Sequence, residues 1–139
     1  MALGLVAGVL LLNSPAQSCA VFRPFRFEAI KNATLVFKGR VVDYSPRIGT
    51  APATITFKII EMYRGDRYDT LKLTWPNETF GTPLTWDHSP EAIVAAIRNP
   101  LPPALSKEQF AVFQETCSSA FLLEDTAATR EKVRALISR

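Results

Sequence analysis

Residue types that do chemistry are sparse in this chain. His88 is the only histidine among the 139 residues, so a metal site built from several histidines is excluded. Asp87 and Ser89 flank it, but three neighbours in sequence do not make a catalytic triad, which is assembled in space. The pair Ser118-Ser119 has no identifiable base. We therefore expect a non-enzymatic protein with no cofactor and no metal ion of its own.

The N-terminal residues have the pattern of a secretory signal. Residues 3–12 form an apolar run that is long enough for such a signal. The run is too short for a membrane span, which needs about 20 apolar residues. Small residues at Ala16 and Ser18 then give a cleavage pattern before Cys19. We expect residues 1–18 to be a signal peptide, and the protein to be secreted or periplasmic without a transmembrane span.

Two alternatives for the N-terminus stay open. Ser18 and Ala20 offer a second cleavage pattern, which would make Val21 the first residue of the mature chain. A lipoprotein anchor at Cys19 fits less well, because the Ala16-Gln17 pair before it departs from the lipoprotein signal.

The two cysteines of the chain, Cys19 and Cys117, are an even number in an exported protein. We therefore expect a disulfide between them. Cleavage before Val21 would discard Cys19 and remove this pairing. Asn32 and Asn77 each begin an Asn-x-Thr sequence, which accepts a glycan only in a eukaryotic secretory pathway.

Residues 19–139 are enough for one domain with one core, and β patterns dominate their first two thirds. Residues 34–44 are rich in β-branched and aromatic side chains and contain Gly39, where a strand bends at a barrel corner. Residues 53–63 and 71–75 alternate apolar with polar side chains and are separated by a turn, which predicts a hairpin. The predicted inner face of its first strand carries Ile55, Phe57, Ile59 and Tyr63.

The C-terminal half is more ambiguous. Residues 92–98 and 107–115 each fit a helix or a strand, and we predict strands because the flanking segments are β. Residues 125–139 carry a stripe of apolar side chains typical of an amphipathic helix, and a short helix is expected around residues 27–31. Together these elements predict an all-β fold, a small five- to six-stranded OB-like closed barrel with one helix near each end of the chain.

Three passages of the chain resemble a known family. They are "AIKNATLVFKGRVVDY", "ATITFKIIEMYRGDRYDTLKLTW" and "FQETCSSAFLLED", with Phe37, Gly39, Tyr63, Gly65 and Cys117 as the positions that carry the likeness. The passages resemble the bacterial exported relatives of the netrin-like module. That family includes the inhibitory domain of the tissue inhibitors of metalloproteinases, so the resemblance implies the same barrel over most of the mature chain.

The resemblance also implies a function for the N-terminus. In those inhibitors, an N-terminal cysteine chelates the protease zinc through its amine and carbonyl, which take the open position of a catalytic zinc. Cys19 would be that residue, and Ala20 would point toward the specificity pocket. The chain departs from the inhibitors, which begin Cys-x-Cys and have several more cysteines. The alternative is that Cys19 only staples the N-terminus, which stabilises a fold by about 2–4 kcal/mol.

A second candidate site is a basic face of the barrel. Lys38, Arg40, Lys58 and Lys72 fall on the polar phase of the first three predicted strands, and the chain has a net charge of +3. Such a stripe across an OB-like barrel would bind an anionic glycan or envelope polymer rather than DNA in an exported protein. The alternative is an ordinary solvated face. The sequence thus predicts an exported, non-enzymatic binding module for a protein or an anionic polymer, with metalloproteinase inhibition as the alternative.

Overall fold

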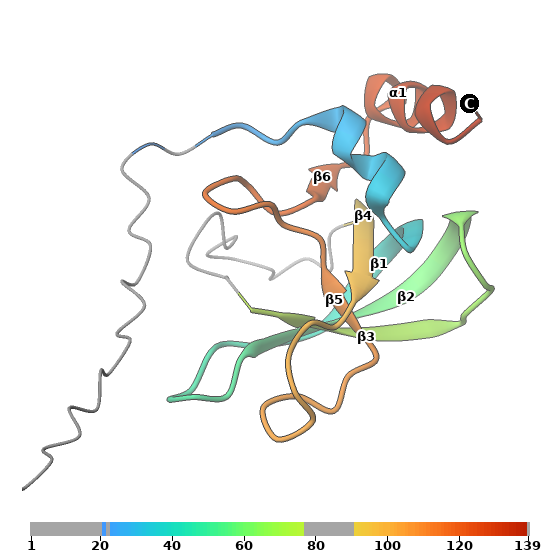
Figure 1. Ribbon diagram of the computed structural model, residues 1–139. Coiled ribbons are helices and arrows are strands. Elements are labelled where there is room, and N and C mark those ends of the chain that lie inside the picture. The colour runs from blue at the N-terminus through green and yellow to red at the C-terminus, as the bar shows by residue number, and fades with distance from the viewer. Residues whose placement is uncertain (1–20, 22, 77–90, 139) are drawn as a thin grey trace, which may run out of the picture.

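The computed structural model describes residues 21, 23–76 and 91–138 of the chain (Figure 1). It contains a 3-10 helix, six strands and an α-helix. These elements are η1 (Phe27–Asn32), β1 (Leu35–Ser45), β2 (Ala53–Arg64), β3 (Thr70–Trp75), β4 (Glu91–Arg98), β5 (Phe110–Val112), β6 (Leu122–Glu124) and α1 (Ala127–Ile137).

Five of the strands close into a barrel. Neighbouring strands follow the order β1-β2-β3-β5-β4, and β4 pairs with β1 to complete the ring. Every pairing is antiparallel except that of β3 with β5. The sixth strand, β6, lies on β4 beside the end that β5 does not cover. The predicted all-β, OB-like closed barrel is therefore confirmed.

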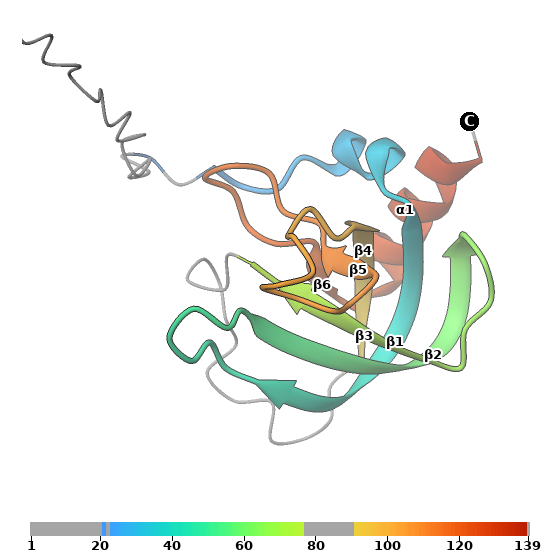
Figure 2. The ribbon, with the colours of Figure 1, turned by 60° about the horizontal axis from the view of Figure 1, so that its bottom comes forward.

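The chain forms two apolar layers, one inside the barrel and one outside it. The inner core contains Phe37 and Phe57, whose ring centroids lie 5.4 Å apart, together with the fully buried Trp75. The outer layer contains Ile30, Val36, Ile93, Phe121 and Val133, all fully buried. Figures 1 and 2 show η1 and α1 side by side over this outer layer. No helix among the described residues is long and apolar enough to cross a membrane.

Gly39 lies at a closely packed position in β1. A Cβ atom at this position would lie 3.1 Å from the Phe57 Cβ and 3.2 Å from the Lys58 carbonyl oxygen. The pairing of β1 with β2 shifts register between Lys38 and Gly39, which marks a bulge where the two strands bend around the barrel. The bend expected at Gly39 is thus confirmed.

The sequence predicted most element boundaries correctly, but it assigned Tyr63 to the wrong face of β2. Residues 92–98 lie in β4, whereas only Phe110–Val112 of residues 107–115 form a strand. Tyr63 packs in the outer layer instead of sharing the inner face with Ile55 and Phe57. The prediction was wrong because register shifts between β1 and β2 interrupt the regular alternation of β2 before Tyr63.

Candidate functional site

The four predicted basic residues all lie on β1, β2 and β3. Arg40 stands opposite Lys58 in the β1–β2 pairing, and Lys72 stands opposite Thr56 in the β2–β3 pairing. Because Lys58 pairs with Thr70, two residues before Lys72, the two lysines are diagonal neighbours. These pairings bring Arg40, Lys58 and Lys72 close together on neighbouring strands.

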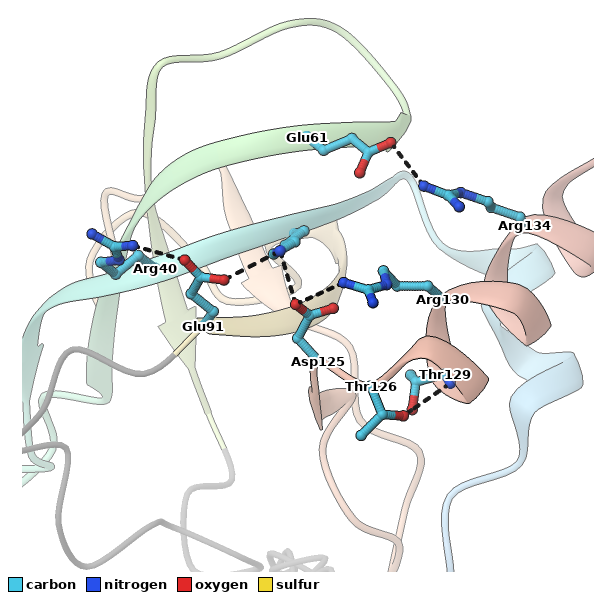
Figure 3. A network of polar contacts seen from close by, with 9 residues as sticks. Arg40, Glu61, Glu91, Asp125, Thr126, Thr129, Arg130 and Arg134 are labelled. Carbon is cyan, nitrogen blue, oxygen red and sulfur yellow. Dashed lines mark hydrogen bonds and ion pairs between the residues drawn. The ribbon is translucent and has the colours of Figure 1, made fainter.

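Carboxylates neutralise most of this basic face. Lys38 Nζ lies 2.8 Å from Asp125 Oδ2 and 3.2 Å from Glu91 Oε2, and its side chain is only 15% exposed. The Arg40 guanidinium also contacts Glu91, at 2.7 Å (Figure 3). Hydrogen bonds from Arg40 and then from Lys38 hold the pKa of Glu91 below its usual value.

The two remaining cations face solvent more openly. Lys72 Nζ lies 3.7 Å from Glu108 Oε1, and Lys58 forms no ion pair with any residue that the structure describes. Within the described part of the chain, Lys58 alone of the four cations lacks a carboxylate partner, so the strand face does not offer an anionic polymer the stripe of four that the sequence suggested. This arrangement favours the solvated-face alternative.

A better-built candidate site lies where the N-terminal segment meets the β5–β6 loop. The backbone N–H of Arg23 donates to the Cys117 carbonyl oxygen at 2.8 Å, and Arg23 forms a parallel bridge with Ser118. Arg26 and Glu115 then form a two-pronged ion pair, with Nη2–Oε1 at 2.8 Å and Nε–Oε2 at 3.2 Å. These contacts hold the segment against the loop at two points.

The ion pair changes the titration of both its members. Hydrogen bonds from Arg26 hold the pKa of Glu115 below its usual value. The same contact raises the pKa of Arg26. Both groups are therefore charged at neutral pH, and the ion pair is present there.

Side-chain hydrogen bonds connect the β5–β6 loop to the barrel. Gln114 accepts a hydrogen bond from the buried Trp75 indole at 3.0 Å and donates to the Ser118 carbonyl oxygen at 2.8 Å. The Ser118 hydroxyl donates to the Glu115 carbonyl oxygen at 3.0 Å. Ser118, which stood out in the sequence as part of a serine pair, thus has a structural role. The hydrogen bonds connect the β5–β6 loop to β3. The loop on which the N-terminal segment lies is therefore attached to the barrel core.

Apolar contacts fix the segment where it enters η1. The Phe25 ring packs edge-on against the buried Phe121, with ring centroids 4.1 Å apart. Beside it, a groove of about 530 Å³ separates residues 25–28 from Lys132 and Leu136 of α1. Lys132 Nζ lies 4.9 Å from the Phe27 ring centroid, so the ammonium covers one aromatic wall of this groove.

Cys117 has an unusual backbone conformation in this loop. Its φ angle of 59° makes it the one residue other than glycine with positive φ in the described part of the chain. Such conformations cost free energy and persist only where surrounding contacts enforce them. Here the hydrogen bonds of Gln114 and Ser118 provide that enforcement.

Cys19 and Ala20, the predicted inhibitory residues, lie outside the described residues. Cys19 precedes Arg23 by four positions in sequence, a separation that spans at most about 14 Å of extended chain. Because Arg23 is hydrogen-bonded to Cys117, a disulfide between the two cysteines is within reach, and it stays a prediction.

We define the N-terminal ridge as residues 23–26 together with residues 114–118. Sequence reasoning found Cys117 in it but missed Arg26 and Glu115, which are 89 positions apart. No local pattern links residues at that separation. Among the described residues, no group of three His, Cys, Asp or Glu side chains is placed to hold a metal ion. His88 and its neighbours lie outside the described residues.

In comparisons with known proteins, no family model matches the chain, and no curated protein matches it.

Proposed function

We propose that the chain is an exported, non-enzymatic binding module that meets a partner protein through the N-terminal ridge. The observation that carries the proposal is the attachment of residues 23–26 to the β5–β6 loop by the Arg23–Cys117 hydrogen bond and the Arg26–Glu115 ion pair. A segment that is ordered before binding loses less conformational entropy when a partner arrives. The ridge is therefore better suited to recognition than the strand face.

The composition of the ridge supports a protein partner. Val21 is 70% exposed just before the ridge, and the Arg26 side chain is 69% exposed although it is ion-paired. Arginine is enriched at protein interfaces because its planar group forms several hydrogen bonds at once. An apolar side chain beside arginines fits a protein surface better than an anionic polymer, which would need a denser set of cations.

Oriented attachment to a sensor surface tests the proposal. One preparation carries a biotin at position 23, inside the ridge, and the matched preparation carries it at position 58, on the exposed strand face. We expect proteins from the culture fluid and envelope of the producing organism to bind the chain attached through position 58 and not the one attached through position 23. Equal binding in both orientations, or binding only through position 23, would reject the ridge.

Metalloproteinase inhibition is the second candidate, and the position of Cys117 favours it. The Arg23–Cys117 hydrogen bond places Arg23, which follows Cys19 by four positions in sequence, beside the one other cysteine. A disulfide there would hold the α-amine and carbonyl of Cys19 in a fixed position, as chelation of an open zinc site requires. The function remains non-enzymatic in both candidates.

A panel of zinc metalloproteinases distinguishes the two. A chain that begins at Cys19 is compared with one that has a single extra alanine before Cys19, which moves the amine away. Inhibition by the first and not by the second supports chelation. No inhibition by either would leave the ridge as a binding surface of another kind and reject the inhibitor.

A further inference from the structure

A groove between the N-terminal segment and α1 continues from the N-terminal ridge. Its volume of about 530 Å³ is large enough for side chains of a partner. Phe25 and Arg26 line the groove and also belong to the ridge. Figures 1 and 2 show η1 and α1, which border the groove, next to each other. A partner that covers the ridge can therefore also reach the groove.

The walls of the groove are mainly apolar. Phe25 and Phe27 line it from the N-terminal segment, with ring centroids 6.0 Å apart. Ala135 and Leu136 line it from α1. The Phe25 ring also packs on the buried Phe121, which holds it in place before a partner arrives. Aromatic and aliphatic walls of this kind fit an apolar side chain of a ligand.

The two walls differ in charge. On the N-terminal segment, Arg26 is ion-paired with Glu115. The pKa of Arg26 is raised chiefly by its hydrogen bond to Glu115 and further by the negative charge of Glu28, which also lines the groove. The cation on this wall is therefore already compensated by carboxylates.

The wall of α1 carries a cation that is not compensated in this way. Lys132 lines the groove and forms no ion pair with any residue that the structure describes. Its Nζ lies 4.9 Å from the Phe27 ring centroid, so the ammonium is held beside the apolar surface. A carboxylate bound at Lys132 would thus lie directly beside an apolar side chain in the groove.

We propose that the groove binds a segment of the partner protein in which an apolar side chain stands next to a single carboxylate. The apolar side chain lies between Phe27 and Leu136, and the carboxylate contacts Lys132. Glu28 on the other wall repels a second carboxylate, so the charges also select the direction in which the segment lies. This inference rests on the proposed function, because it names the part of the ridge's partner that the groove recognises.

Defined peptides test the groove on the isolated chain, without the partner. The acidic probe is the acetylated and amidated tetrapeptide Gly-Phe-Leu-Glu, and its two matched forms end in glutamine and in lysine. Each is titrated into the isotope-labelled chain, and its affinity is measured from the amide chemical shifts of residues 25–28 and 132–137. We expect the acidic peptide to bind most tightly and the lysine peptide least tightly.

Matched variants locate the binding. Lys132→Gln should weaken binding of the acidic peptide about two- to fivefold and leave the glutamine peptide unchanged, because one exposed ion pair is lost. Lys107→Gln, in the loop between β4 and β5, removes the same charge elsewhere and should change neither affinity. Ala135→Phe should abolish binding of all three peptides by filling the groove, whereas Ala128→Phe, at another exposed position of α1, should not.

Two results would overturn the inference: equal affinity for the acidic and lysine peptides, or no shifts at residues 25–28 and 132–137 with any peptide. Should Ala135→Phe fail to fold, Lys132→Gln decides, since Lys132 is exposed and has no ion pair to lose among the described residues. The ridge is judged separately by attachment through positions 23 and 58. Orientation-dependent capture by a chain that binds no peptide would reject the groove alone, and peptide binding without such capture would reject the ridge alone.

Discussion

The backbone N–H of Arg23 lies 2.8 Å from the carbonyl oxygen of Cys117, which connects the start of the described chain to a loop 94 positions later in the sequence. The hydrogen bond is part of the parallel bridge between Arg23 and Ser118, and the Arg26–Glu115 ion pair holds the same segment three residues later. Residues 23–26 are thereby fixed to the β5–β6 loop, which is itself hydrogen-bonded to the barrel.

The first prediction is that Cys19 and Cys117 form a disulfide in the purified mature protein. The reason is that the Arg23–Cys117 hydrogen bond brings the N-terminal segment within reach of Cys117. Thiol labelling without reductant should then find no reactive cysteine, and reduction should lower the free energy of unfolding by about 2–4 kcal/mol. Two reactive thiols in the native protein would contradict this prediction.

The second prediction concerns the bend in β1. Gly39→Ala should lower the free energy of unfolding by about 1–3 kcal/mol, because the new methyl group would crowd Phe37, Phe57 and the Lys58 carbonyl. Urea denaturation measures the change. Gly49→Asn is the control, since Gly49 has open space around it and asparagine tolerates its φ of 57°. A Gly39→Ala variant as stable as wild type would show that β1 does not need glycine at the bend.

The sequence predicted the barrel because its signals are local. Gly39 within a β-branched run and the alternation of Ile55 and Phe57 each depend on residues a few positions apart. Residues 92–98 were harder, since a continuous apolar run fits a buried strand or a helix equally well. Tyr63 was placed on the wrong face because the register shifts between β1 and β2 leave no signature in the sequence of β2 alone.

The candidate site was less predictable for a related physical reason. Lys38, Arg40 and Lys58 were correctly grouped, because alternation along paired strands fixes which side chains share a face. Their carboxylate partners come from elsewhere in the chain: Glu91 lies 51 positions from Arg40. Pairing at that distance depends on the closed barrel, so the neutralisation of the basic face became visible only in three dimensions.

The third prediction tests that neutralisation. Replacing both Lys58 and Lys72 with glutamine should change the free energy of unfolding by no more than about 0.5 kcal/mol, because both side chains lie at the surface. Retention on an anionic polymer column should change little as well, since most of the neighbouring cations are already paired with carboxylates. A large, salt-dependent loss of retention would instead identify the strand face as a binding surface.

The fourth prediction concerns the start of α1. The Thr126 side chain accepts a hydrogen bond from the Thr129 backbone N–H at 3.1 Å and caps the helix. Thr126→Ala should destabilise α1 by about 1 kcal/mol, measured as faster amide exchange in the helix. Thr129→Ala is the comparison, because it keeps the capped N–H and removes only the contact between the Thr126 and Thr129 hydroxyls, at 2.9 Å. Equal effects of the two variants would mean that the hydroxyl of Thr126 does not act as a cap.

The identity of the N-terminal ridge as the binding surface is tested most directly by site-specific photo-crosslinking. A photoreactive amino acid is placed at position 23 in one preparation and at position 58 in another, and each is irradiated in culture fluid and envelope fractions of the producing organism. We predict a discrete crosslinked product from position 23 that excess unlabelled wild-type chain suppresses, and none from position 58. A competitor carrying Arg26→Ala and Glu115→Ala should suppress the product less effectively, because the segment is then released from the loop. A suppressible product from position 58 with none from position 23 would contradict the account.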